Sequence, residues 1–286
     1  LETMGNSAFL SKKINTELDR LEEVTNIPQM DTSTDKLETS HYDITLDHVS
    51  FGYDKRQVIH DISLNIPEHT TCAIVGPSGS GKTTLCNLIA RFWDVQDGAV
   101  RIGGKDVKNY TADSILEHIS MVFQNVYLFH DSIENNIKFG KPNASHAEVV
   151  AAAKRACCHD FIMQLPQGYD TMIGEGGCTL SGGEKQRISI ARAVLKDAQV
   201  ILLDEATASL DPENEVEMQK AIDTLIKGRT VITIAHKLKT IMNANRIIVL
   251  DDGQVKEQGT HDELIRVDGL YARLWKIQES TSGWNL

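Results

Sequence analysis

A glycine-rich segment constrains the fold of this chain more than any other feature. Residues 76–83 read GPSGSGKT and fit the pattern G-x-x-x-x-G-K-[ST]. An apolar run at 71–75 precedes the segment and a helical pattern follows it, so the glycines fall where a buried strand turns into a helix. Backbone N–H groups in such a turn, together with the helix N-terminus, attract an anion. The segment therefore predicts a phosphate-binding loop in an α/β fold.

The same loop predicts that the chain binds a nucleoside triphosphate together with Mg²⁺. Lys82 is placed to reach the β- and γ-phosphates, and the hydroxyl of Thr83 is placed to coordinate Mg²⁺. A chance Gly/Ser loop is the alternative, which the strand before the loop and the helix after it disfavour. The predicted nucleotide-binding residues of this segment are Gly76, Pro77, Ser78, Gly79, Ser80, Gly81, Lys82, Thr83 and Thr84.

A second apolar run ends in two acidic residues. Residues 200–205 read VILLDE. Asp204, at the end of a buried strand, is predicted to hold the Mg²⁺ shell. Glu205 points differently and is predicted to polarise the attacking water as a general base. Acidic residues after a strand also form simple turns, but the phosphate-binding loop favours the functional interpretation.

A third motif, LSGGEKQR at 180–187, comes directly before a helical stretch. It resembles the signature motif of ATP-binding-cassette (ABC) ATPases, at the place where that family carries it. The resemblance implies that Ser181, Gly182, Gly183 and Glu184 bind a nucleotide, because the glycines let backbone N–H groups approach a phosphate at a helix N-terminus. An ordinary helix cap, with Ser181 as the N-cap and Glu184 three residues on, is the structural alternative.

The resemblance adds four single residues to the site. It implies that Gln124 meets both Mg²⁺ and the attacking water, and that it abuts a transmembrane partner. It implies further that His236 contacts the γ-phosphate and that adenine stacks on Tyr53. Asp211 resembles the residue that communicates across the dimer of this family. Without these surroundings, Gln, His and Tyr are more often structural residues, and Asp211 would form a plain turn before Pro212.

The predicted fold class is α/β. The resemblance covers residues 41–280 and implies a P-loop NTPase (RecA-like) core with a mostly parallel central sheet, an antiparallel β edge subdomain and a small α-helical subdomain at about 126–190. The strand before the glycine-rich loop, the Val200 strand, the Val231 strand and the run at 247–250 are predicted to be apolar on both faces. Such runs are typical of central parallel strands, and ligands bind at the carboxyl ends of these strands.

Alternation of apolar and polar residues predicts the antiparallel strands. Residues 44–46 and 62–66 alternate as half-exposed strands. A turn at Gly98 is predicted to join residues 93–95 to residues 100–102. We expect this sheet to lie near the base of the nucleotide.

Residues 1–40 are predicted to connect the ATPase domain to a preceding domain. An amphipathic helix is expected from apolar residues at helical spacing, namely Leu10, Ile14, Leu18 and Leu21. The polar stretch at 25–40 predicts a linker. Since the chain starts at Leu1, we expect a piece of a longer polypeptide, with 1–40 coming from a preceding transmembrane domain, 41–280 forming the ABC ATPase domain and 281–286 forming a tail. An autonomous coiled coil or a tag remnant is the alternative for the helix.

The composition bounds the partners and the location of the chain. A formal net charge of −11 argues against a nucleic-acid partner, because binding to a phosphate backbone needs clustered Lys and Arg. The five cysteines contain no C-x-x-C pair, so neither a disulfide framework nor a zinc site is predicted, and reduced cytosolic thiols are expected. No apolar stretch reaches the roughly 18 to 20 residues that span a bilayer. The predicted location is the cytoplasmic face of a cell membrane.

Two positions depart from the family pattern. Glu184 stands where this family most often has Gln, which keeps the length of the side chain and adds charge, so altered pairing is expected. Glu175 matches the loop that precedes the signature in exporter-type members, but Gly176 stands where many of them have Arg. That difference weakens the exporter assignment slightly and puts an inter-domain salt bridge from this position in doubt.

The resemblance implies the nucleotide-binding domain of an exporter half-transporter, which hydrolyses ATP to ADP and phosphate. Two copies of this family associate head to tail, so that ATP on the loop of one copy meets Ser181 and Gly183 of the other. The chain has the residues for a homodimer, and a heterodimer with a degenerate partner stays open. An importer ATPase subunit shares every catalytic motif and is the first alternative. A soluble ABC ATPase of DNA repair or translation is the second.

Overall fold

The computed structural model describes residues 12–22, 33–54, 56–174, 179–204, 212–235 and 237–282. Two compact units divide the chain, residues 1–33 and residues 34–286. In the first unit, residues 12–22 form a helix, as the apolar spacing predicts. Ile14, Leu18 and Leu21 are exposed and share one apolar patch of this helix. Leu10 lies outside the described residues.

The end of the predicted linker is held by the second unit. The backbone N–H of Thr111 donates to the carbonyl of Asp35 at 2.8 Å. The N–H of Leu37 donates to the Ser114 hydroxyl at 2.9 Å, and the Leu37 side chain is buried. These contacts tie residues 35–37 to the second unit.

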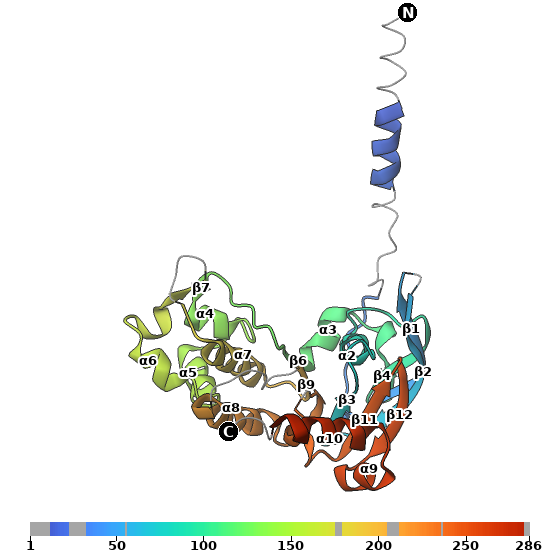
Figure 1. Ribbon diagram of the computed structural model, residues 1–286. Coiled ribbons are helices and arrows are strands. Elements are labelled where there is room, and N and C mark those ends of the chain that lie inside the picture. Colours follow the sequence, from blue (N-terminus) through green and yellow to red (C-terminus); the bar gives the residue numbers. More distant parts are fainter. Residues whose placement is uncertain are drawn as a thin grey trace, which may run out of the picture. The chain divides into compact units, whose positions relative to one another are not determined.

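A six-stranded sheet lies at the centre of the second unit (Figure 1). The strand order is β12-β11-β3-β10-β9-β6, in which β12 is antiparallel to its neighbour and the other strands run parallel. The predicted mostly parallel central sheet is therefore confirmed. The strands are β3 (Thr71–Val75), β6 (Ile119–Val122), β9 (Val200–Asp204), β10 (Thr230–Ile234), β11 (Arg246–Asp251) and β12 (Gln254–Gly259).

The inner parallel strands of the central sheet are buried on both faces, which explains why apolar residues dominate them, whereas the edge strand β12 is polar. Along β9, Val200 and Leu202 pack into one hydrophobic core with the antiparallel sheet. The alternate residues, Ile201 and Leu203, pack into a second core with the helices of residues 133–195. Successive side chains of a strand point to opposite faces, so this one strand supplies both cores.

The register of the sheet brings the carboxyl ends of four parallel strands to one edge. Ile234 of β10 stands opposite Asp204 of β9 and also opposite Ile74 of β3. On the far side of β9, Val122 of β6 stands opposite Leu203. The residues that follow these strands therefore meet at a common edge, where ligands bind in parallel sheets.

A four-stranded antiparallel sheet, ordered β2-β1-β4-β5, forms the predicted edge subdomain. Its strands are β1 (Ile44–Tyr53), β2 (Arg56–Ile66), β4 (Asp97–Ile102) and β5 (Lys105–Asp106). The predicted hairpin turn at Gly98 is wrong, because Gly98 lies inside β4 and that strand pairs with β1 and β5. Gly98 has φ +79°, and a Cβ there would lie 2.3 Å from the carbonyl oxygen of Asp47. Glycine is needed here for a close approach between strands at a register shift.

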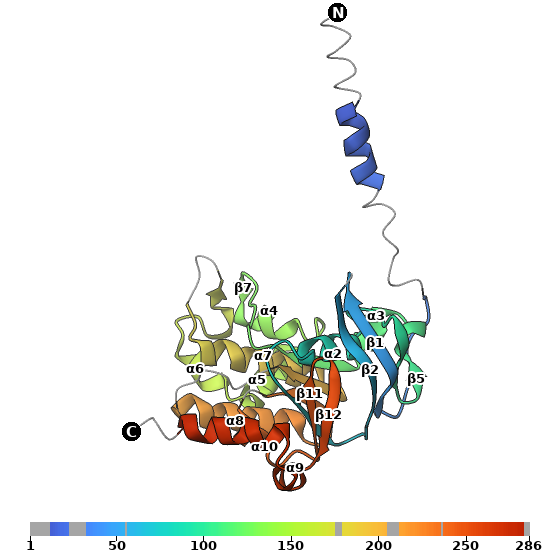
Figure 2. The ribbon, with the colours of Figure 1, turned by 45° about the vertical axis from the view of Figure 1, so that its right-hand side comes forward.

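Four helices of the second unit lie together, away from the antiparallel sheet (Figures 1 and 2). Figure 1 shows α4, α5, α6 and α7 together on one side, away from the antiparallel sheet, and Figure 2 shows the same separation from a second direction. The helix α7 packs against α4, α5 and α8. The helices are α2 (Lys82–Ile89), α3 (Ala112–Glu117), α4 (Ile133–Lys138), α5 (His146–Arg155), α6 (His159–Gln164), α7 (Gly182–Lys196), α8 (Pro212–Ile226), α9 (His261–Val267) and α10 (Leu270–Ser282). Short 3₁₀ turns occur at Val107–Asn109, Gly168–Asp170 and Leu238–Ile241, and β7 (Asp131–Ser132) pairs with β8 (Met172–Ile173).

Four cysteines in the described part of the chain are free thiols, namely Cys72, Cys86, Cys157 and Cys158. Burial raises the pKa of the Cys72 thiol to about 12, so this thiol stays neutral at pH 7. Cys178 lies outside the described residues. Among the residues that the structure describes, no helix is both long and apolar enough to cross a membrane.

Candidate functional site

The glycine-rich loop begins at Gly76, directly after β3. Gly76 has φ +150°, and a Cβ at this position would lie 2.0 Å from the carbonyl oxygen of Leu250 on the neighbouring strand β11. Any side chain would therefore force the loop away from the sheet. The turn from strand to loop depends on glycine for space as well as for its backbone conformation.

The loop ends at Gly81, which is the N-cap of α2. Gly81 has φ +100°, and a Cβ there would meet Ile59 of β2 at 2.8 Å. Because glycine has no side chain, no side-chain cap closes the N-terminus of α2. The first N–H groups of an α-helix have no partner within the helix, so this end can receive an anion.

Lys82 lies across the loop. Its side chain is 7% exposed, and Nζ donates hydrogen bonds to the carbonyls of Gly76 at 2.9 Å and Pro77 at 2.8 Å. Beside it, the Ser80 hydroxyl is buried and has no hydrogen-bond partner in the described part of the chain. A cationic side chain, an unpaired hydroxyl and an uncapped helix end fit a phosphate group.

Oxygen donors for Mg²⁺ stand at the edge of the central sheet. Thr83 is exposed in the first turn of α2, Asp204 is half-buried at the end of β9, and Gln124 is exposed just after β6. Hydroxyl, carboxylate and amide oxygens are hard ligands of the kind that Mg²⁺ takes alongside substrate phosphates. No group of three His, Cys, Asp or Glu side chains that could hold a metal is found within the described ranges. By the chemistry of their oxygen donors, Thr83, Asp204 and Gln124 fit Mg²⁺ that arrives with a nucleotide.

Tyr53 belongs to an aromatic cluster at the end of β1. Its ring makes edge contacts with Phe51 at 5.0 Å and with Trp93 at 5.4 Å between ring centroids. Trp93 is 49% exposed. These T-shaped contacts fix the ring of Tyr53. Sequence analysis did not single out Trp93, because the contact joins residues that only the folded sheet brings together.

The signature motif caps α7. The Ser181 hydroxyl accepts a hydrogen bond from the N–H of Glu184 at 3.3 Å, and the Ser181 N–H donates to the Glu184 carboxylate at 2.7 Å. This reciprocal pair is a capping box. Glu184 is therefore paired as in an ordinary helix cap, the alternative raised by the sequence. The Ser181 hydroxyl keeps its own O–H as a donor.

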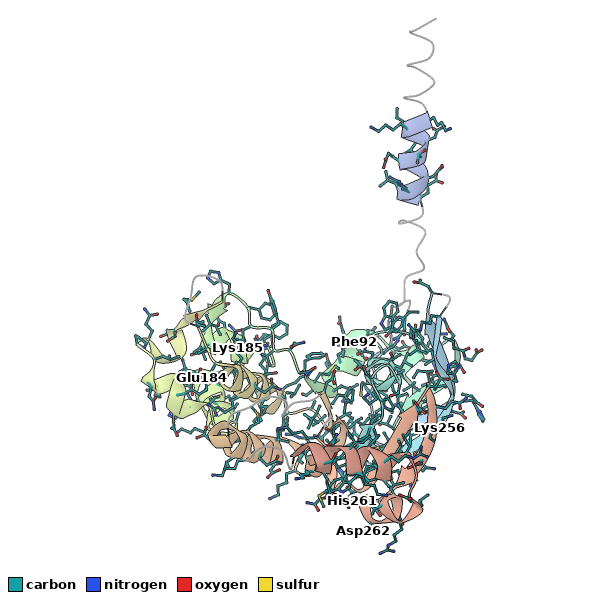
Figure 3. The ribbon with its side chains drawn as sticks, in the orientation of Figure 1. Phe92, Glu184, Lys185, Lys256, His261 and Asp262 are labelled. Atoms are coloured by element: carbon teal, nitrogen blue, oxygen red, sulfur yellow. The ribbon has the colours of Figure 1, made fainter. Side chains whose placement is uncertain are left out.

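The backbone beside the cap is accessible. Ser181 and Gly182 are exposed, and a Cβ added to Gly182 would meet no atom within 4 Å. Gly183 is buried at the start of the helix. Figure 3 labels Glu184 and Lys185 at the first turn of α7, in the helical part of the chain. A second helix start with exposed glycine backbone thus lies at α7, in a different subdomain from α2, and the capping box leaves Gly182 accessible there.

Three predicted site residues, Glu205, His236 and Asp211, lie outside the described residues. So do Glu175 and Gly176. Glu205 directly follows Asp204, the last residue of β9, and His236 directly follows Ala235, which comes after the adjacent parallel strand β10.

The geometry defines a nucleotide-binding α/β protein, and comparison with known proteins identifies its family. The family model "ABC transporter" matches residues 59–208. The chain is 49% identical over 230 residues to the "ATP-dependent lipid A-core flippase" of Desulfotalea psychrophila, a match that covers 80% of this chain and 40% of that protein. It is also 49% identical over 232 residues to the "ABC transporter aclQ" of Aspergillus oryzae, covering 81% of this chain and 29% of that protein.

A solved structure extends the similarity to the fold. The structure of a bacterial Atm1-family ABC exporter with ATP bound matches with a TM-score of 0.85 and 40% identity, covering 93% of this chain and 47% of that chain. The chain belongs to the ABC transporter family, and the relatives that it matches include an exporter. It spans 40% or less of the length of the two curated relatives named here.

Proposed function

We propose that this chain binds Mg²⁺–ATP on the loop of residues 76–84 and hydrolyses it to ADP and phosphate in order to drive an exporter. The observation that carries the proposal is the uncapped N-terminus of α2, with Lys82 lying across a loop whose glycines have positive φ. The loop N–H groups and the Lys82 ammonium would hold the phosphates. Tyr53 would present its ring to adenine.

The catalytic roles rest on residues at the edge of the central sheet. Thr83, Asp204 and Gln124 would hold Mg²⁺, which when bound neutralises charge on the phosphate oxygens. Glu205 would accept a proton from the water that attacks the γ-phosphorus, while the bond from phosphorus to the bridging oxygen breaks and ADP leaves. His236 would contact the γ-phosphate.

We infer that a second ABC ATPase domain completes the site. Two helices begin at glycine-rich motifs, α2 without a side-chain cap and α7 with a capping box that leaves Gly182 exposed. In a head-to-tail pair, Ser181, Gly182 and Gly183 of one copy would close over ATP on the other copy, and Asp211 would lie at the contact. The pair would be a homodimer, with a heterodimer as the alternative.

A transmembrane domain is the proposed second partner. A groove of about 360 Å³ lies beside the Gln124 loop, and its lining includes Phe123, Tyr127 and Phe139. Tyr127 is 73% exposed. Exposed aromatic side chains around a hollow are typical of protein interfaces. Residues 1–40 would join this domain to the ATPase domain at 41–280, with the helical subdomain at about 126–190 and a tail at 281–286, on the cytoplasmic face of the membrane.

The dimer is tested by light scattering and by the concentration dependence of hydrolysis. Without nucleotide we expect a monomer, and the Glu205→Gln variant with Mg²⁺–ATP should form a dimer. Hydrolysis by the unchanged chain should rise faster than linearly with protein concentration, since the active site needs two copies. A monomer with a constant specific rate would contradict the shared site but leave ATP binding by the loop intact.

Mixing two inactive variants tests the head-to-tail arrangement. Ser181→Arg blocks the signature, and Lys82→Ala damages the loop, so a mixed pair contains one site with both elements intact. We expect hydrolysis to reappear on mixing, in proportion to the mixed dimer. Mixing each variant with itself at the same total concentration is the control.

The role of Tyr53 predicts a matched pair of variants. Stacking of a base on an aromatic ring contributes about 1 to 3 kcal/mol, which is about 5- to 150-fold in affinity. Tyr53→Ala should weaken ATP and GTP alike by this factor, whereas Tyr53→Phe, which keeps the ring, should bind like the unchanged chain. Equilibrium binding of both nucleotides checks this, and equal affinities for all three proteins would make Tyr53 a packing residue only.

A further inference from the structure

The helix that begins with the signature also holds the loop that carries Gln124. Residues 123–129 leave β6 and run toward α4, and Gln124 and Asn125 are exposed within this segment. Two side chains of α7 reach across to the backbone of the segment, one near each end. Neither contact is part of the roles proposed above.

The first contact comes from Gln186. Its side chain is 6% exposed, and Nε2 donates to the carbonyl of Phe123 at 3.2 Å. Phe123 directly precedes Gln124, so this hydrogen bond fixes the backbone from which Gln124 extends. A buried amide that loses its acceptor is left unsatisfied, which makes the contact specific rather than incidental.

The second contact comes from Arg192. One guanidinium nitrogen donates to the carbonyl of Tyr127 at 2.7 Å, and two others donate to the carbonyl and the side-chain oxygen of Asn136, each at 2.6 Å. The guanidinium also lies over the rings of Phe129 and Phe139. Desolvation lowers the pKa of Arg192 to about 10, so the side chain remains a cation at pH 7.

Both contacts start from one rigid element. Gln186 and Arg192 are six residues apart on α7, about 9 Å of helical rise. Ser181 is the N-cap of the same helix, where nucleotide on a second copy would bind. A displacement of α7 therefore carries the carbonyls of Phe123 and Tyr127 with it, and with them Gln124.

We propose that Gln186 and Arg192 are positioning residues that set the place of Gln124 at the metal–nucleotide site, an inference that rests on the role proposed for Gln124. Nucleotide binding at the N-terminus of α7 would then shift the Gln124 loop through the hydrogen bonds of Gln186 and Arg192. The ligand of this site would be a divalent cation bound together with a nucleoside triphosphate.

Gln186 provides the sharper test, because removing Arg192 would break three hydrogen bonds at once, two of them to Asn136 outside the Gln124 loop. Gln186→Leu removes the donor with little change in size, and Gln219→Leu is the matched control. Gln219 lies exposed on α8 and donates to Asp223 within the same helix. Gln186→Met, which keeps the unbranched shape, replaces the leucine variant if thermal unfolding shows that the latter is not folded.

The measurement is Mn²⁺ binding, followed by electron paramagnetic resonance in the 286-residue chain with adenylyl imidodiphosphate. Gln186→Leu should raise the half-saturating Mn²⁺ concentration about fivefold, the equivalent of one ordinary hydrogen bond. Gln219→Leu should change nothing. In ATP hydrolysis, Gln186→Leu should lower kcat and raise KM for the metal–ATP complex by about the same fivefold, because weaker metal binding in the ternary complex weakens binding of the metal–nucleotide pair equally.

A double-mutant cycle with Gln124→Ala decides between positioning and mere stability. If Gln186 acts through Gln124, then Gln186→Leu has no further effect on Mn²⁺ binding once Gln124 is alanine. A second loss of the same factor overturns the positioning role and leaves the proposed function standing. Unchanged Mn²⁺ binding by Gln124→Ala alone overturns the role of Gln124 itself, and this inference with it.

Discussion

Replacing Glu205 with glutamine should leave ATP binding intact and slow hydrolysis by about 10²- to 10⁴-fold, the usual contribution of a general base. The amide keeps the size and polarity of the side chain but cannot accept the proton of the attacking water. The loss corresponds to about 2.7 to 5.4 kcal/mol in the activation barrier. Because Asp204 and the glycine-rich loop are unchanged, nucleotide affinity should not fall.

Single-turnover hydrolysis and equilibrium ATP binding together check this expectation. The matched control is Glu117→Gln, since Glu117 is an exposed carboxylate at the end of α3 on another part of the fold. The control should hydrolyse ATP like the unchanged chain. Turnover of Glu205→Gln within a few-fold of the unchanged chain would remove Glu205 from the role of base.

Lys82→Ala should act at an earlier step and weaken ATP binding itself. The variant loses charge-assisted hydrogen bonds to the phosphates, worth about 1.5 to 3 kcal/mol and therefore about 10- to 150-fold in affinity. It also loses the hydrogen bonds from Nζ to the carbonyls of Gly76 and Pro77, which hold the loop across the end of β3. The two losses act in the same direction.

Isothermal titration calorimetry with Mg²⁺–ATP measures the effect. Lys220→Ala, which removes an exposed lysine from α8, controls for the change in net charge. Affinity equal to that of the control would show that Lys82 does not contact the phosphates. Comparison with Glu205→Gln then separates a binding defect from a defect in chemistry.

The features that sequence analysis predicted correctly are those with local causes. The glycines of the loop were identifiable because their conformation is imposed within a few residues: Gly76 and Gly81 both have positive φ and no room for a side chain. The central strands were identifiable because burial on both faces favours unbroken apolar runs, as at residues 200–203 in β9 and 247–250 in β11.

The features that sequence analysis missed depend on contacts between distant residues. Gly98 was predicted to form a hairpin turn, yet its conformation serves a close approach to β1, which only the sheet register reveals. The edge contact of Trp93 with Tyr53 and the hydrogen bond from Gln186 to Phe123 likewise join separate elements. No spacing in the sequence signals such pairs, because each arises from the packing of the finished fold.

Strand β9 separates two hydrophobic cores and contributes side chains to both. Val200 and Leu202 pack into one core, and Ile201 and Leu203 pack into the other. Loss of either core would therefore expose one face of a strand on which the other core also depends. The helices of residues 133–195 therefore cannot be deleted without exposing one face of β9 to water. Asp204 is the last residue of β9, so its position depends on the packing of both cores.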